Sequence, residues 1–148
     1  MTRQQYITKT RERLRGYRAL TYYCQVAEER IQDTYETATN VVPPYGERIG
    51  HSDIEKPNPG AILADNRRFQ EDKRHLEISK RELRGIDGAI SLLLEPEQTI
   101  IKMLYCQPHP ANWTQIAKAV NFSARQCQRY HGDALAFLIR AFFGAEAM

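Results

Sequence analysis

Apolar residues recur at helical intervals along most of the chain. Over about residues 2–38 there is no proline, and apolar or aromatic side chains recur mostly at intervals of three, four or seven. This pattern predicts one long amphipathic helix. Residues 61–94 hold the clearest repeat of the chain, with an apolar residue at every seventh position: Ile62, Phe69, Leu76, Leu83 and Ile90. This repeat predicts a second long helix with a seam typical of a coiled coil.

Residues 40–60, between the two long helices, have the composition of a loop. They include four prolines and three glycines, which cannot sustain helical hydrogen bonding. Two amphipathic helices joined by a loop predict an antiparallel hairpin in which the two seams face each other. Pairing between two chains would bury the same surfaces, so a homodimer through the long helices is the alternative.

A third apolar helix is expected after Glu95 and Pro96, because proline is tolerated in the first turn of a helix. This helix should end before Pro108. Asn112 then can cap a further helix, with Gln115 three residues later to complete a capping box. The helix that follows is short.

A tight turn and another helix start come next. Asn121 accepts the left-handed backbone conformation with which short helices end. Ser123 is followed three residues later by Gln126, which predicts a second capping box. Two capped helices separated by Asn121 and Phe122 have the spacing of a helix-turn-helix, with residues 123–138 as its recognition helix.

The predicted recognition helix has an apolar and a cationic side. Its inward stripe is expected to contain Cys127, Tyr130, His131, Ala134, Leu135 and Leu138. The outward residues at its beginning are arginines and glutamines, and no acidic residue occurs between Ser123 and Gly132. Arginine binds guanine edges or phosphate, glutamine can bind adenine, and a helix N-terminus favours an anion, so this surface suits the major groove of DNA. A solvated helix face is the alternative interpretation.

The predicted DNA contacts divide into two kinds. Arg125, Lys118 and Thr114 are expected to contact phosphates. Base contacts are expected from Gln126, Gln128 and Arg129, with Ser123 opening the helix.

Composition and motifs argue against several classes of protein. The chain has 148 residues, of which 42% are hydrophobic, and no apolar run approaches the length of a membrane span. The formal net charge is only +3, so attraction to nucleic acid must be local. Three scattered cysteines without metal-ligand spacing, and no secretory signal, favour a reduced cytoplasmic setting. Motifs for a nucleotide, a metal or a nucleophile are absent from the sequence, so no enzyme activity, metal or cofactor is expected.

The C-terminal segment resembles a known family. Residues 94–138 contain L-x-P-x-x-x-I-I-x-x-x-Y, followed by W-x-x-I-A-x-x-x-x-x-S-x-R-Q-C-x-R-x-H-x-x-A-L-x-x-L. This pattern is similar to that of the ArpU/RinA-type phage and prophage transcription regulators, whose helix-turn-helix resembles region four of bacterial sigma factors. The family's turn glycine is replaced here by Asn121, the valine of its recognition helix is replaced by Cys127, and the linker at residues 108–110 is less typical.

The resemblance implies the roles of several residues. It places Trp113, Ile116 and Ala117 in the positioning helix, and Ser123, Arg125, Gln126 and Arg129 in the recognition helix. It also implies control of phage or prophage late genes in a bacterial host cell. The expected partner is promoter DNA, and host RNA polymerase is a further candidate partner.

Together these observations predict an all-α protein with two parts. Residues 1–94 are expected to form the helical hairpin, and residues 95–148 the DNA-binding helix-turn-helix. Two other functions use the same elements. One is a phage small terminase subunit, which recognises DNA for packaging, and the other is an adaptor that binds RNA polymerase through the hairpin.

Overall fold

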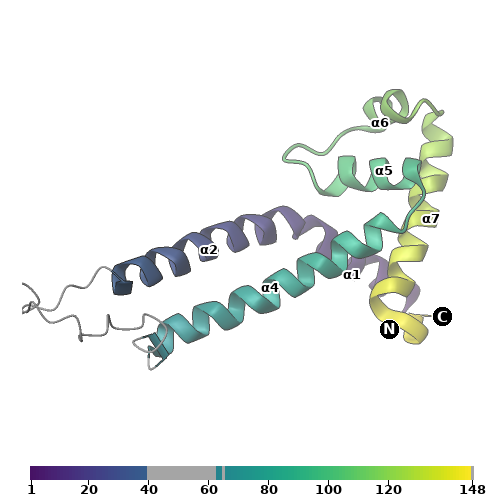
Figure 1. Cartoon of the computed structure of the whole chain (residues 1–148). Helices are drawn as coiled ribbons and strands as arrows, with labels where there is room; N and C mark the ends of the chain where they lie inside the picture. Colours follow the sequence, from purple (N-terminus) through teal and green to yellow (C-terminus); the bar gives the residue numbers. More distant parts are fainter. Residues whose placement is uncertain (40–62, 65, 148) are drawn as a thin grey trace, which may run out of the picture. The chain divides into compact units, whose positions relative to one another are not determined.

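The computed structural model describes residues 1–39, 63–64 and 66–147. These residues form helices, turns and bends without any strand, so the predicted all-α class is confirmed. The elements, labelled as in Figure 1, are α1 (Arg3–Arg15), α2 (Tyr17–Thr39), α4 (Arg67–Ser91), α5 (Glu95–Tyr105), α6 (Trp113–Val120), α7 (Ala124–Phe143) and the 3-10 helix η2 (Gly144–Ala147).

The first predicted helix is interrupted at Gly16, so the prediction of one helix over residues 2–38 is wrong at this position. Gly16 has φ −72° and ψ −9°, a tighter turn than an α-helix makes. Its N–H still donates to the Glu12 carbonyl, and Leu20 N–H donates to the Gly16 carbonyl at 2.9 Å. Glycine is about 1 kcal/mol less favourable than alanine inside a helix, which weakens the helix at this position, although Gly85, Gly88 and Gly132 are accommodated inside α4 and α7.

The second long helix is shorter than the predicted 61–94. It begins after Asn66, whose side-chain oxygen accepts a hydrogen bond from Phe69 N–H at 3.1 Å. It ends where Leu92 and Leu93 donate three residues back instead of four. Leu94 then has an extended backbone and starts α5. The predicted loop at 40–60 and Ile62 lie outside the described residues.

The chain forms two compact units: residues 1–21 with 81–148, and Tyr22–Lys80. The position between residues 94 and 95, where the sequence suggested a boundary, lies inside the first unit. The reason is a shared core, because apolar side chains at the ends of α1 and α4 pack with those of α5 and α7. The buried members of this core are Leu14, Ile86, Ala89, Ile90, Leu93, Ile101, Tyr105, Ala134, Leu135 and Leu138.

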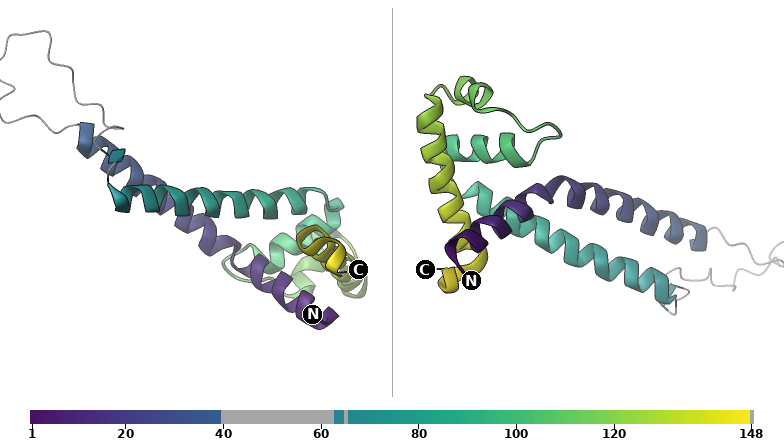
Figure 2. Two further views of the ribbon diagram at one scale, coloured as in Figure 1. Left: turned by 90° about the horizontal axis from the view of Figure 1, so that it is seen from below. Right: turned by 180° about the vertical axis from the view of Figure 1, so that it is seen from behind.

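Helix α7 is the central element of the first unit. It packs against α1, α5, α6 and η2. Figures 1 and 2 show α5 and α6 on one side of α7, and the beginning of α1 beside the end of α7. At that end Phe143 meets the Tyr6 ring edge-on at 5.1 Å, and the Arg13 guanidinium lies 4.2 Å from the centre of the Phe142 ring. Two of the three C-terminal phenylalanines therefore dock on α1.

The second unit pairs segments of α2 and α4 in opposite directions. Its apolar cluster joins Ala38, Leu63 and Phe69, with Ile31 partly buried against them. Farther along, Lys80 forms an ion pair with Glu28. Such partly exposed pairs stabilise by at most about 1 kcal/mol. None of the described helices has the length and apolar composition that crossing a membrane requires.

Candidate nucleic-acid interface

Helices α5, α6 and α7 are held together by a small core of their own. Ile100, Ile116 and Cys127 provide one fully buried side chain from each helix. Partly buried apolar residues surround these three: Met103, Leu104, Ala111, Trp113, Ala117, Val120, Phe122 and Tyr130. The buried stripe predicted for α6 is present, and it fixes the short helix against α7.

The start of α6 is capped as predicted. The Asn112 side-chain oxygen accepts from Gln115 N–H at 2.8 Å, and the Gln115 side chain accepts from Asn112 N–H at 3.0 Å. Both bonds of the capping box are therefore formed, and a helix of only 8 residues gains about 1 kcal/mol from such a cap.

The turn between α6 and α7 depends on Asn121. This residue has φ 61° and ψ 39°, and it is the one non-glycine residue with positive φ in the described chain. Its N–H donates to the Ala117 carbonyl, and Phe122 N–H donates to the same carbonyl at 3.3 Å, as at many helix ends. The Phe122 ring then packs on Tyr130 at 5.3 Å, which holds the turn against α7.

At the start of α7 only half of the predicted capping box is formed. The Ser123 hydroxyl accepts from Gln126 N–H at 3.2 Å. The return bond from the Gln126 side chain, which Gln115 makes in α6, is missing at this cap. The prediction of a complete box is wrong here, and the Gln126 amide remains available to a ligand.

The predicted contact residues are all exposed. They are Thr114, Lys118, Ser123, Arg125, Gln126, Gln128 and Arg129. The structure brings four of them together, because Ser123, Arg125, Gln126 and Arg129 line one open hollow of about 540 Å³ at the start of α7. The other three lie outside this hollow. On the opposite side of α7, Cys127, Ala134, Leu135 and Leu138 are buried as predicted.

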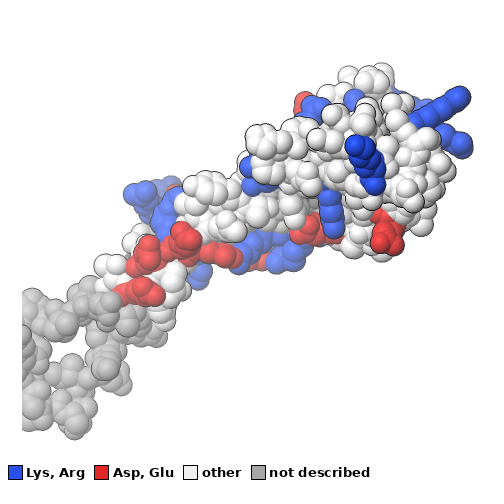
Figure 3. All heavy atoms as spheres, turned by 90° about the horizontal axis from the view of Figure 1, so that it is seen from above, with Lys and Arg blue, Asp and Glu red and all other residues white. Residues whose placement is uncertain are grey.

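The basic side chains of this surface are not neutralised. In the part of the chain that the structure describes, Lys118, Arg125 and Arg129 form no ion pair. Figure 3 shows several basic and a few acidic side chains on an otherwise largely uncharged surface at its right-hand end. The charges of Lys118, Arg125 and Arg129 are therefore available to an anionic partner.

Asp133 limits the basic surface along α7, and it received no role from the sequence. It lines a smaller hollow of about 130 Å³ with Gln126, Arg129 and Tyr130. Burial, and secondarily the charge of Asp133, raise the pKa of the Glu97 carboxyl on α5. Asp133 therefore adds negative charge to α7 one helical turn after Arg129.

A partly buried polar contact positions the beginning of α6, and the sequence gave no indication of it. The Tyr105 hydroxyl and His131 Nε2 are 2.7 Å apart, and Trp113 meets the His131 ring edge-on at 5.5 Å. Burial, with a smaller effect of the Arg11 charge, lowers the pKa of His131 to about 4. The imidazole is therefore neutral at pH 7 and supports Trp113 without adding charge.

The described residues show no clustering of His, Cys, Asp and Glu that could hold a metal ion. All three cysteines are free, and burial raises the pKa of the Cys127 thiol, as expected for a small apolar side chain. Comparison with protein-family models, curated proteins and solved structures finds no match to the chain. Functional inference therefore starts from the geometry of α6 and α7.

Proposed function

We propose that this chain is a sequence-specific DNA-binding transcription regulator. In this proposal α6, the Asn121 turn and α7 form a helix-turn-helix. A helical hairpin of α2 and α4 precedes it in the sequence. The observation that carries the proposal is the hollow at the start of α7. There Arg125, Gln126 and Arg129 are exposed around a helix N-terminus, and neither arginine forms an ion pair with any described residue.

The chemistry of this surface matches duplex DNA in two ways. A helix N-terminus and unpaired guanidinium groups attract phosphate. Arginine and glutamine can also each form paired hydrogen bonds to base edges in the major groove. Arg125, Lys118 and Thr114 would contact phosphates, while Gln126, Gln128 and Arg129 would contact bases.

The resemblance to ArpU/RinA-type regulators supports the biological setting. On this basis we assign the chain to control of phage or prophage late genes, with a promoter as its DNA target. Host RNA polymerase is the second partner in this assignment, and a homodimer through the long helices would pair two DNA half-sites.

Selection of bound duplexes from a random pool tests the proposal with the full chain. We expect one sequence motif to be enriched and its affinity to fall steeply with salt. The Arg125→Ala/Arg129→Ala variant should lose this binding. Arg68→Ala/Arg74→Ala is a matched control, because it removes two exposed arginines from α4.

Three outcomes would contradict the proposal. They are the absence of any enriched motif, binding of the double variant as tight as that of the wild type, and equal weakening of binding in the control. Sedimentation of the complex separates regulation from packaging, since a closed ring of many subunits would favour a small terminase.

A further inference from the structure

A second hollow lies at the opposite end of α7 from the candidate DNA surface. It measures about 540 Å³ and lies between the beginning of α1 and the end of α7. Tyr6 and Ile139, which are 7% and 8% exposed, form its apolar floor, with Ala136 beside them. The Tyr6 hydroxyl donates to the Glu146 carbonyl at 2.9 Å, which fixes one wall.

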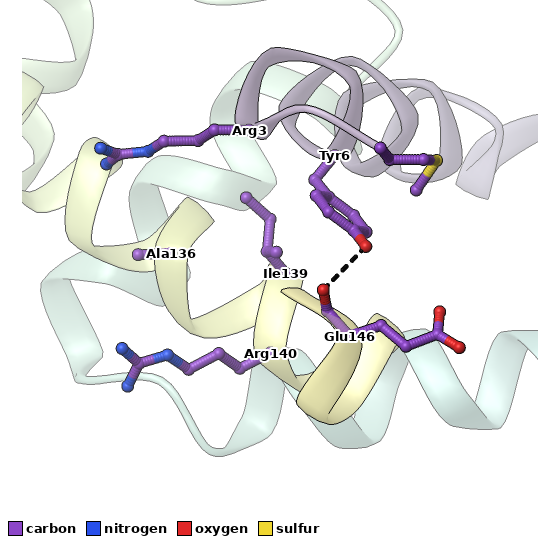
Figure 4. Close-up of a pocket in the computed structure, with 7 residues that line it drawn as sticks. Arg3, Tyr6, Ala136, Ile139, Arg140 and Glu146 are labelled. Carbon is purple, nitrogen blue, oxygen red and sulfur yellow. Dashed lines mark hydrogen bonds between the residues drawn. The ribbon is translucent and has the colours of Figure 1, made fainter. Parts of the chain in front are cut away.

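Two arginines flank this apolar floor. Figure 4 shows Arg3 and Arg140 extending toward the same side, with Ala136 and Ile139 between them. Both side chains are exposed, and within the described chain neither forms an ion pair. The Glu146 carboxylate points the other way (Figure 4). Arg3 also lies in the first turn of α1, whose N-terminal dipole adds positive potential.

This basic surface is separate from the one at the start of α7. An α-helix rises about 1.5 Å per residue, so Arg140 lies roughly 16 Å along α7 from Arg129. Asp133 is exposed and occupies nearly the same face of the helix between them. A duplex that followed α7 from one arginine to the other would place phosphates against the Asp133 carboxylate, which repulsion disfavours.

We propose that the hollow between α1 and α7 binds an acidic peptide segment of a partner protein. An apolar side chain of that segment would cover Ile139 and Tyr6, and carboxylates before and after it would pair with Arg3 and Arg140. Guanidinium groups form paired hydrogen bonds with carboxylates. A nucleic-acid backbone supplies anions but no aliphatic group for the floor, so it fits this hollow less well. The inference goes beyond the proposed function and does not depend on it.

Selection from a random library of short peptides, with the full chain as bait, tests this inference. We expect enriched peptides to combine aspartate or glutamate with a leucine, isoleucine or phenylalanine. A synthetic copy of the enriched peptide should bind the Arg3→Glu/Arg140→Glu variant about tenfold more weakly or worse, because reversed charges repel it. The Arg3→Gln/Arg140→Gln variant should show a smaller loss. Arg68→Glu/Arg74→Glu, a matched reversal on α4, should bind as the wild type does.

The inference is overturned if no peptide is enriched, if enriched peptides lack acidic residues, or if they bind the charge-reversed variant equally well. It is also overturned if Arg3→Glu/Arg140→Glu binds duplex DNA more weakly than the wild type but binds the peptide equally well. The two arginines would then contact nucleic acid. The melting temperatures of Arg3→Glu/Arg140→Glu and Arg3→Gln/Arg140→Gln are expected to equal that of the wild type, because both arginines are exposed. The two proposals fail independently. Arg125→Ala/Arg129→Ala should bind the peptide as the wild type does, whether or not the wild type binds DNA.

Discussion

The two ends of α7 differ although they belong to one helix. At its beginning, Arg125, Gln126 and Arg129 are exposed around an open hollow. Over its second half, Ala134, Leu135 and Leu138 are buried in the core shared with α1 and α5. One end of the helix is thus an exposed polar surface, while apolar side chains of its second half belong to the core. Substitutions at the two ends should consequently have separable effects, and the following predictions test that separation.

The largest expected effect is on stability, from the buried end. Leu138 is 0% exposed, so Leu138→Ala leaves a cavity and should lower the free energy of unfolding by about 3 to 4 kcal/mol. The adjacent Phe137 is 38% exposed, and Phe137→Ala should cost about 1 kcal/mol or less. Urea unfolding of both variants measures the difference. Equal losses would show that the two sides of this helix do not differ in packing.

The second largest effect is expected on DNA binding, from substitutions at the exposed beginning of α7. Removing both arginines in Arg125→Ala/Arg129→Ala should weaken binding to the selected duplex by about 3 kcal/mol. It should also reduce the steepness of the salt dependence. The free energy of unfolding should change by less than about 0.5 kcal/mol, because neither side chain is buried or paired. A comparable loss of stability would mean that these arginines support the fold.

His131, midway along α7, should produce a pH-dependent effect. Its pKa of about 4 lies below the ordinary 6.5, so the unfolded chain takes up the proton first as pH falls. Stability is therefore full above pH 6.5 and declines as the pH falls toward about 4. Between pH 7 and pH 4.5 the wild type should lose about 2 kcal/mol more than His131→Gln, which cannot titrate. Urea unfolding at both pH values measures this difference. An equal loss of stability in the wild type and in His131→Gln would contradict the low pKa of His131.

The smallest effect is expected at the cap of α7. Ser123→Ala removes the hydrogen bond to Gln126 N–H and should cost about 1 kcal/mol of stability. Ser123→Asp keeps the cap and should retain stability, but its negative charge should repel phosphate and weaken DNA binding. Thermal melting and duplex titration of both variants separate the two roles of this residue. Normal DNA affinity of Ser123→Asp would place phosphate elsewhere.

The sequence-based prediction is wrong at two positions where a local sequence pattern did not determine the structure. A regular apolar pattern suggested one helix across Gly16, but the structure has a turn at this residue, where glycine lowers the helix propensity. A serine and a glutamine at capping-box spacing suggested two reciprocal bonds, but only the serine bond is formed.

The sequence by itself determined the helical class, the cap at Asn112, the left-handed turn at Asn121 and the opposite faces of α7. These features depend on contacts within about one helical turn, which residue spacing records directly. Only the tertiary structure decided which elements share a core, paired Tyr105 with His131, and placed Arg3 opposite Arg140. Such contacts join residues far apart in the chain, and they follow from how whole helix faces pack against one another.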